Sequence, residues 1–285
     1  MIATAFDYVT PGTLDEALAM LSQNQDSAKI LAGGHSLIPA MKLRLAQPAL
    51  LIDIGRIKDL SYIREDGGQI RIGAMTTHYQ IESSDLLKLV CPMLPECAAQ
   101  IGDVQVRNKG TLGGSLAHAD PAADWPAAMI ALKAEIVVVG AKGERIINID
   151  DFFVDLLTTS LEPNEILREI RINKPAGNYG QAYRKAAQPA SGFAVVGVAA
   201  HIVKDADGKC EAASIGVTGA ASKAYRATSV ENALVGNALD ATTIAAAAAS
   251  AADGIDVNGD IYASEDYRRH LVAVYARRAI EAAIQ

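Results

Sequence analysis

Apolar residues near the start of the chain follow a helical spacing. Those between Leu14 and Leu21 lie three or four positions apart, and Thr13 and Glu16 have the spacing of a capping box. The pattern predicts a helix over residues 14–23.

Two short apolar runs follow this helix, at residues 29–32 and 49–55, with a helical run at 37–45 between them. Short apolar runs bounded by turn residues are typical of buried strands. The order predicts a strand-helix-strand crossover whose first corner carries Gly33 and Gly34.

The pattern changes after Ser61 to alternating, β-rich runs. The Asp-Gly-Gly stretch at 66–68 and the Lys-Gly pair at 142–143 separate such runs, which predicts two hairpins. Helical spacing occupies residues 77–101. Pro121 is placed to open a further helix, because proline is favoured in the first helical turn. These elements predict a second lobe.

The last third of the chain predicts a further sheet followed by helices. Runs at 165–173 and 179–188 alternate as strands, and two antiparallel strands are expected to join at an Asp-Gly pair at 207–208. An alanine-rich piece after Thr242 and the segment 264–284 are predicted to be helical.

Length and charge limit the number of lobes that the chain can form and the classes of protein to which it can belong. A chain of 285 residues that is 50% hydrophobic can bury a sizeable core and is expected to form two or three lobes. Its net charge of -7 argues against a nucleic-acid or membrane-surface protein, because either needs a concentrated basic face. The opening residues lack the features of a signal peptide, and no apolar stretch is long enough to span a membrane. We expect a cytoplasmic protein.

The cysteines do not point to a metal or redox site. Cys91 and Cys97 are separated by five residues, which matches neither a C-x-x-C pair nor common zinc spacing, and Cys210 stands alone. We expect all three to be reduced core or loop thiols.

Two glycine-containing segments, called the first and second corner, are the candidate ligand-binding sites. The first reads LAGGHSLIPAMKLR from Leu31, and the second reads VRNKGTLGGSLAHADPAAD from Val106. Neither has the spacing of a Walker loop or a Rossmann turn. One Gly-Gly pair alone fits a tight turn without a ligand. Two such corners with hydroxyl residues beside them favour a diphosphate held from both sides by amides and by Ser36, Thr111 and Ser115.

Several polar residues near these corners have alternative interpretations. His35 and His118 lack further ligands at metal spacing, so they are interpreted as loop histidines bonded to backbone. Asp120 and Asp124 could form a carboxylate pair for acid/base work. Asp120 is interpreted instead as a first-turn residue stabilised by a helix dipole, which is also an alternative for Asp124. Trp125 is interpreted as a core residue rather than a cofactor contact.

The paired corners resemble the two flavin-binding signatures of the FAD-containing medium subunits of molybdenum hydroxylases, the group of aerobic carbon monoxide dehydrogenase and xanthine dehydrogenase. The resemblance extends over essentially the whole chain, including EILREIRIN from Glu165 and YRKAAQPASGFAVVGVAA from Tyr183. It implies an α+β fold of the vanillyl-alcohol-oxidase/PCMH type. FAD-binding lobes would occupy residues 1–55 and 56–176, and a C-terminal domain with a small antiparallel sheet and helices would occupy 177–285.

The same resemblance implies a set of FAD contacts on this chain. The two corners would hold the diphosphate, Asp124 the sugar or ribityl hydroxyls, and Lys185 and Phe193 would lie at the flavin ring, with apolar and main-chain contacts from Ile101 and Leu167. The implied residues are Ala32, Gly33, Gly34, His35, Ser36, Ile101, Thr111, Leu112, Gly113, Gly114, Ser115, Asp124, Leu167, Lys185 and Phe193.

The chain departs from the family pattern at two places. Ser115 stands where asparagine is common, which removes one donor from the second corner. Ser191 and Gly192 precede Phe193 where many relatives carry aspartate just before the aromatic residue, a variant closer to the carbon monoxide dehydrogenase branch.

By the same resemblance, the chain is an electron-transfer subunit without catalytic residues or a metal of its own. A large subunit with a molybdopterin cofactor would oxidise the substrate, a small subunit with [2Fe-2S] clusters would pass the electrons singly, and the flavin would deliver them in pairs to a small-molecule acceptor. A dimer of heterotrimers is the expected assembly. The alternatives are an independent FAD-dependent oxidase or dehydrogenase and a scaffold that binds no cofactor.

Overall fold

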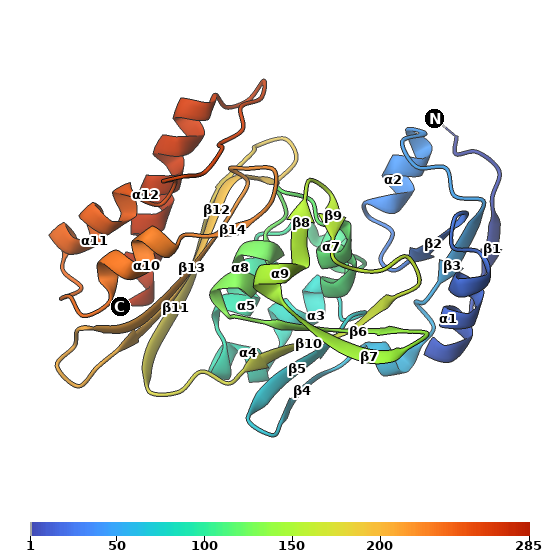
Figure 1. Ribbon diagram of the computed structural model, residues 1–285, viewed down its shortest axis with the longest axis horizontal. Coiled ribbons are helices and arrows are strands. Elements are labelled where there is room, and N and C mark those ends of the chain that lie inside the picture. Colours follow the sequence, from blue (N-terminus) through green and yellow to red (C-terminus); the bar gives the residue numbers. More distant parts are fainter. Residues whose placement is uncertain (1) are drawn as a thin grey trace.

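A computed structural model describes residues 2–285 of the chain, which form three parts arranged in a row (Figure 1). The N-terminal part lies at one end, the C-terminal sheet and helices lie at the other, and a second α+β part lies between them. The order matches the expected fold class, since each part combines helices with its own sheet.

The N-terminal part is a small parallel sheet with two helices. Its strands pair in the order β1-β3-β2, which confirms the predicted crossover. Thr13 caps the first helix by accepting from the Glu16 amide, as the capping-box spacing predicted. The elements are β1 (Asp7–Val9), α1 (Leu14–Gln23), β2 (Ala28–Leu31), α2 (Leu37–Lys42) and β3 (Leu50–Asp53).

The central part is built on an antiparallel sheet with the order β4-β5-β10-β6-β7. Both predicted hairpins are present in it, and Gly67 and Gly68 form the first turn with φ of 59° and 79°. A short 3-10 helix, η1 (Lys58–Leu60), leads into the sheet. The strands are β4 (Ile63–Asp66), β5 (Gln69–Gly73), β6 (Glu135–Gly140), β7 (Gly143–Asn148) and β10 (Ile166–Asn173).

The helical segment predicted over 77–101 is confirmed and consists of three short helices. Ser84 ends one helix and caps the next, and the segment at Cys91 and Pro92 separates the second from the third. The helices of the central part are α3 (His78–Ser83), α4 (Asp85–Val90), α5 (Met93–Ala99), α6 (Val104–Arg107), α7 (Leu112–His118), α8 (Trp125–Ala131) and α9 (Ile149–Phe152). A two-stranded ribbon, β8 (Phe153–Asp155) and β9 (Thr158–Thr159), follows α9.

Two predictions around the second corner are wrong. Gly113 and Gly114 lie inside helix α7 instead of in a loop before it, because Thr111 already caps that helix. Pro121 opens no helix, because the next helix begins at Trp125 with Pro126 in its first turn. Asp120 is therefore not a first-turn residue, and its carboxylate accepts from the Ala122 amide at 2.8 Å within a turn.

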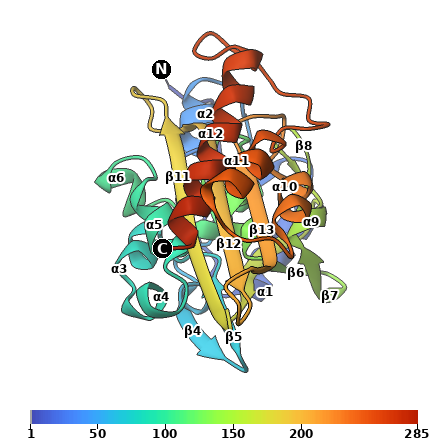
Figure 2. The same cartoon turned by 90° about the vertical axis from the view of Figure 1, so that its left-hand side faces the viewer.

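The C-terminal part is a four-stranded antiparallel sheet with helices on its outer face. Figure 2 shows the long helix α12 lying over β11 and β12, and α10 packs on β13. Helix α8 of the central part packs on β12 and β13 from the opposite side (Figure 1). The elements are β11 (Asn178–Ala187), β12 (Ala194–Lys204), β13 (Cys210–Thr218), β14 (Tyr225–Arg226), α10 (Thr228–Leu234), α11 (Ala241–Ala249) and α12 (Glu265–Ala283).

The three cysteines, Cys91, Cys97 and Cys210, are free thiols and all are buried, as the sequence predicted. Among the helices of residues 2–285, none is both long enough and apolar enough to cross a membrane.

Candidate functional site

The first glycine corner presents unbonded amides. Gly34 has a φ of 76°, a conformation that glycine adopts without strain. Between residues 2 and 285, no acceptor is found for the backbone N–H groups of Gly33, Gly34, His35 and Ser36. The Ser36 side chain caps no amide of α2, so its hydroxyl is also available. This corner can therefore donate several hydrogen bonds to an anion.

His35 is held to the corner by its own backbone. Its Nδ1 lies 3.0 Å from the Gly33 carbonyl oxygen, and this acceptor places the proton on Nδ1. The interpretation of His35 as a loop histidine bonded to backbone is confirmed. Across residues 2–285, no group of three or more His, Cys, Asp or Glu side chains is placed to hold a metal ion.

The second corner differs from the sequence interpretation, because its amides are already bonded inside the protein. The backbone N–H groups of residues 112–115 donate at 2.9 to 3.1 Å to the carbonyl oxygens of Ala74, Thr76 and Thr111 and to the Thr111 hydroxyl. These bonds fix the start of α7 on the end of the central sheet. On this side, the groups that remain to form hydrogen bonds with a ligand are the hydroxyls of Thr111 and Ser115.

The structure brings the two corners into direct contact. A β-carbon built on Gly33 would lie 2.2 Å from the Lys109 carbonyl oxygen and 2.8 Å from the Gly110 Cα. A β-carbon on Gly114 would lie 3.3 Å from that of Ala32. The first corner of one lobe thus packs directly on the second corner of the other, and a diphosphate held between the lobes stays a prediction.

Replacing Gly33 with alanine is expected to weaken both lobe packing and FAD binding. The clash is with rigid backbone of the other lobe, so we expect a loss of about 1 to 3 kcal/mol in the free energy of unfolding. Urea unfolding and FAD titration measure the two effects. Gly12→Ala is the matched control, because its new β-carbon would meet only the end of the Glu16 side chain at 3.6 Å. Equal behaviour of the two variants would contradict the contact between the corners.

A buried ion pair lies near the second corner. Lys185 Nζ, on β11, is 2.8 Å from Asp124 Oδ1 and 2.9 Å from the Gln100 carbonyl oxygen, and the Tyr183 hydroxyl donates to Asp124 Oδ1 at 2.5 Å. The Lys185 and Asp124 side chains are only 1% and 4% exposed. Burial raises the pKa of the Asp124 carboxyl, and the Lys185 ammonium opposes that rise.

The surroundings of Asp124 bear on its interpretation. Asp124 is the N-cap residue of α8, which agrees with the alternative of a helix-start residue, although its side chain caps no amide of that helix. Its carboxylate is engaged by Tyr183 and Lys185, and it joins the central part to the C-terminal sheet. The contact with a cofactor hydroxyl stays a prediction.

The residues expected at the flavin ring lie in two adjacent loops and one strand. Phe193 is 46% exposed, and its loop touches the 101–103 loop, where a β-carbon on Gly192 would be 3.7 Å from the Gly102 Cα. Ile101 packs on the edge of the central core. The Leu167 side chain, in contrast, is 5% exposed within that core.

Sequence reasoning missed two residues of this region. Tyr183 lies two positions before Lys185 on a strand, and the same-face rule for strands would have indicated that it lies beside the lysine. His78 is buried beside Trp125, whose indole N–H donates to His78 Nδ1 at 3.1 Å. No motif or spacing marks His78 in the sequence. Trp125 is fully buried, which confirms its interpretation as a core residue.

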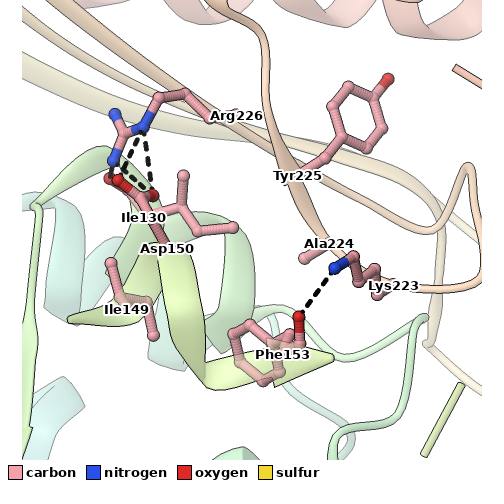
Figure 3. Close-up of a pocket in the computed structure, with 8 residues that line it drawn as sticks. All are labelled: Ile130, Ile149, Asp150, Phe153, Lys223, Ala224, Tyr225 and Arg226. Atoms are coloured by element: carbon pink, nitrogen blue, oxygen red, sulfur yellow. Dashed lines mark hydrogen bonds and ion pairs between the residues drawn. The ribbon is translucent and has the colours of Figure 1, made fainter. Parts of the chain in front are cut away.

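A separate groove of about 370 Å³ lies where the central and C-terminal parts meet (Figure 3). Its two cations are engaged, since Lys223 donates to the Phe153 carbonyl oxygen at 2.9 Å and Arg226 pairs with Asp150 at 2.8 Å. None of the residues expected to contact FAD lines it. Its lining consists of Ile130, Ile149, Asp150, Phe153, Lys223, Ala224, Tyr225 and Arg226.

The unbonded amides where the first two α+β parts meet suit a cofactor that carries an anionic group. Residues 4–175 match the FAD binding domain in molybdopterin dehydrogenase, and residues 181–283 match the CO dehydrogenase flavoprotein C-terminal domain. The chain belongs to the FAD-binding medium subunits of the molybdenum hydroxylase family. Proteins of this kind are subunits of oxidoreductases.

Individual relatives match over nearly their whole length. The carbon monoxide dehydrogenase medium chain of Hydrogenophaga pseudoflava is 39% identical over 99% of this chain and 98% of its own. The 6-hydroxypseudooxynicotine dehydrogenase complex subunit alpha of Paenarthrobacter nicotinovorans is 36% identical over 98% and 95%. A solved carbon monoxide dehydrogenase from Hydrogenophaga pseudoflava superimposes with a TM-score of 0.96 at 41% identity, covering 99% of this chain and 98% of that one.

Proposed function

We propose that this chain accepts electrons from [2Fe-2S] clusters of a small partner subunit and passes them through FAD to an external small-molecule acceptor. A molybdopterin-binding large subunit would oxidise the substrate. The observation that carries the proposal is the junction of the two corners, which packs the segment with unbonded amides in one lobe against the segment with Thr111 and Ser115 in the other. The names of several relatives, which are medium chains or subunits of dehydrogenases, support it.

The residues present fit FAD. The amides of the first corner suit a diphosphate, and Gly33 and Gly34 leave the backbone open to it because they carry no side chain. When bound, FAD supplies the chemistry of accepting electrons one at a time and releasing them in pairs. The chain contributes binding and orientation, through the set of fifteen residues named from the resemblance. Thr111 and Ser115 would act through their hydroxyls rather than their amides.

The buried pair of Lys185 and Asp124 would set the charge near the flavin ring. Because the carboxylate of Asp124 lies 2.8 Å from the Lys185 ammonium, the two charges largely cancel at a distance. We infer that Lys185 acts mainly by position and hydrogen bonding, and only locally by charge.

Three further features belong to the proposal. The divisions at 1–55, 56–176 and 177–285 are supported by the boundaries of the three main sheets, which span residues 7–53, 63–173 and 178–226. A dimer of heterotrimers is the proposed assembly. The cytoplasm is the proposed location.

An independent flavin oxidase or dehydrogenase is the second candidate, because the exposed ring of Phe193 leaves an open apolar surface beside the proposed flavin position. A scaffold without cofactor finds no support in a chain whose residues 4–175 match an FAD-binding domain.

The isolated chain is expected to bind FAD and to be reduced by dithionite, but not by the organic substrate of the native complex. The reason is that it offers no molybdopterin site and no evident substrate base. Anaerobic stopped-flow at the flavin absorbance measures this. Addition of both partner subunits should restore reduction by substrate, and omission of the iron-sulfur subunit should abolish it. Rapid reduction of the isolated chain by that substrate would instead establish the independent enzyme.

A further inference from the structure

His78 occupies the junction of the two corners although no glycine signature contains it. It is the first residue of α3, and its backbone N–H donates to the Gly110 carbonyl oxygen at 3.0 Å. The preceding residue, Thr77, forms an isolated β-bridge with Thr111 of the second corner. The histidine is thus tied by backbone contacts to the segment against which Gly33 packs.

The proton of the His78 imidazole is placed by its neighbour. The Trp125 indole donates to Nδ1 at 3.1 Å, so the neutral ring carries its proton on Nε2. Burial, with the positive charges of His35 and Arg107, lowers the pKa of His78 to about 4. The ring is therefore neutral across the physiological range, and its Nε2–H remains a donor.

This donor is unused by the protein and lies against the corner backbone. His78 is only 4% exposed, and residues 2–285 supply no acceptor for Nε2, which keeps part of that small exposed area because it is not among the fully buried polar atoms. A β-carbon on Gly110 would lie 2.6 Å from Nε2, and the Gly110 Cα would in turn lie 2.8 Å from a β-carbon on Gly33. The bare backbone of Gly110 leaves this edge of the ring uncovered where the lobes meet.

A donor that the chain leaves without an acceptor, on a side chain that is largely enclosed where the lobes meet, is placed to bond to a ligand held there. We propose that the His78 Nε2–H donates a hydrogen bond to a diphosphate oxygen of FAD, an inference that rests on the proposed cofactor site. Trp125 is then a positioning residue, since it fixes the tautomer without touching the ligand.

Two variants of His78 separate this role from a structural one. In His78→Gln the side-chain amide can reach the Nε2 position and donate there, whereas in His78→Asn the shorter side chain can accept from Trp125 near the Nδ1 position but cannot replace the Nε2–H. Full-length deflavinated protein is titrated with FAD by fluorescence and with ADP, which has the diphosphate but no flavin ring. Thermal unfolding without ligand controls for the fold.

We expect His78→Asn to weaken FAD and ADP binding by tenfold to about a hundredfold, the usual effect of losing a hydrogen bond to a charged group, and His78→Gln to stay within about threefold of the wild type. The reverse order, or equal losses in both variants, would overturn the inference and leave His78 as the acceptor for Trp125.

If neither variant folds, ¹⁵N NMR of the wild-type imidazole decides, since ADP should shift the Nε2–H resonance. An unshifted resonance at saturating ADP would overturn the inference. Failure of the wild-type protein to bind FAD would refute the cofactor site itself. If the wild type binds FAD and His78→Asn binds it equally well, only the role of His78 is refuted.

Discussion

Replacing Lys185 with methionine is expected to lower the free energy of unfolding by about 3–5 kcal/mol. The substitution keeps an apolar stem of similar length but leaves the Asp124 carboxylate, 4% exposed, without its ammonium partner. The Gln100 carbonyl oxygen also loses the donor that lies 2.9 Å away. Urea unfolding at pH 7 measures the loss.

The loss should depend on pH with a definite sign. Burial raises the pKa of Asp124 above its unfolded value, and without Lys185 only the hydrogen bonds from the Tyr183 hydroxyl and from the backbone oppose that rise. A carboxyl whose pKa is raised on folding binds protons more readily in the folded state, so the stability of Lys185→Met should increase as pH falls from 8 toward 5.

Two controls accompany this prediction. Lys174→Met breaks an exposed ion pair with Glu65 at 2.8 Å and should change stability by about 1 kcal/mol or less. Asp124→Asn combined with Lys185→Met should recover part of the loss, because it removes the unpaired charge. A Lys185→Met protein as stable as the wild type at every pH would show that the pair contributes nothing to folding.

Replacing Arg268 with methionine is expected to lower the free energy of unfolding by about 2 to 4 kcal/mol, since each orphaned buried carbonyl costs about 1–3 kcal/mol. The Arg268 guanidinium donates to the carbonyl oxygens of Val195 at 2.7 Å and Gly219 at 2.5 Å, and it pairs with Asp260 at 2.5 Å. FAD should also dissociate faster, because Val195 lies two residues after Phe193 in the same segment.

Arg277→Met is the matched control for Arg268, since it lies on the same helix and pairs only with Glu281 at 3.4 Å on the surface. Its effect should stay below about 1 kcal/mol. Chemical unfolding and FAD release, followed by fluorescence, are measured on both variants. A control that destabilises the protein as much as Arg268→Met would refute the special role of the buried guanidinium.

The strands and turns of the fold could be predicted because local residues determine them. The hairpin at Gly67 and Gly68 and the capped helix after Thr13 both follow from turn and capping chemistry. The start of α8 could not be predicted from Pro121, because Pro126 competes for the same first-turn role. Tertiary contacts of the 120–124 turn decide between them, including the bond from the Gly219 amide to the Pro121 carbonyl oxygen at 2.7 Å.

The candidate site was predictable where its hydrogen-bond donors are backbone amides. Glycines mark the first corner, and its amides are unbonded as expected. The sequence cannot show that the amides of the second corner bond to Ala74 and Thr76, since those partners lie on a distant segment. For the same reason it could not place His78 beside Trp125, a contact between residues 47 positions apart.

The three buried thiols give this protein internal reporters of local opening. Burial raises the pKa of Cys91 to about 12 and that of Cys210 to about 11, so neither thiol forms an appreciable thiolate in the closed protein. Cys97 is fully buried near Asp124 and Lys185, and Cys210 lies in the C-terminal core. Alkylation followed by mass spectrometry would therefore time the opening of the central and C-terminal parts separately, and the native chain needs no added label for such an experiment.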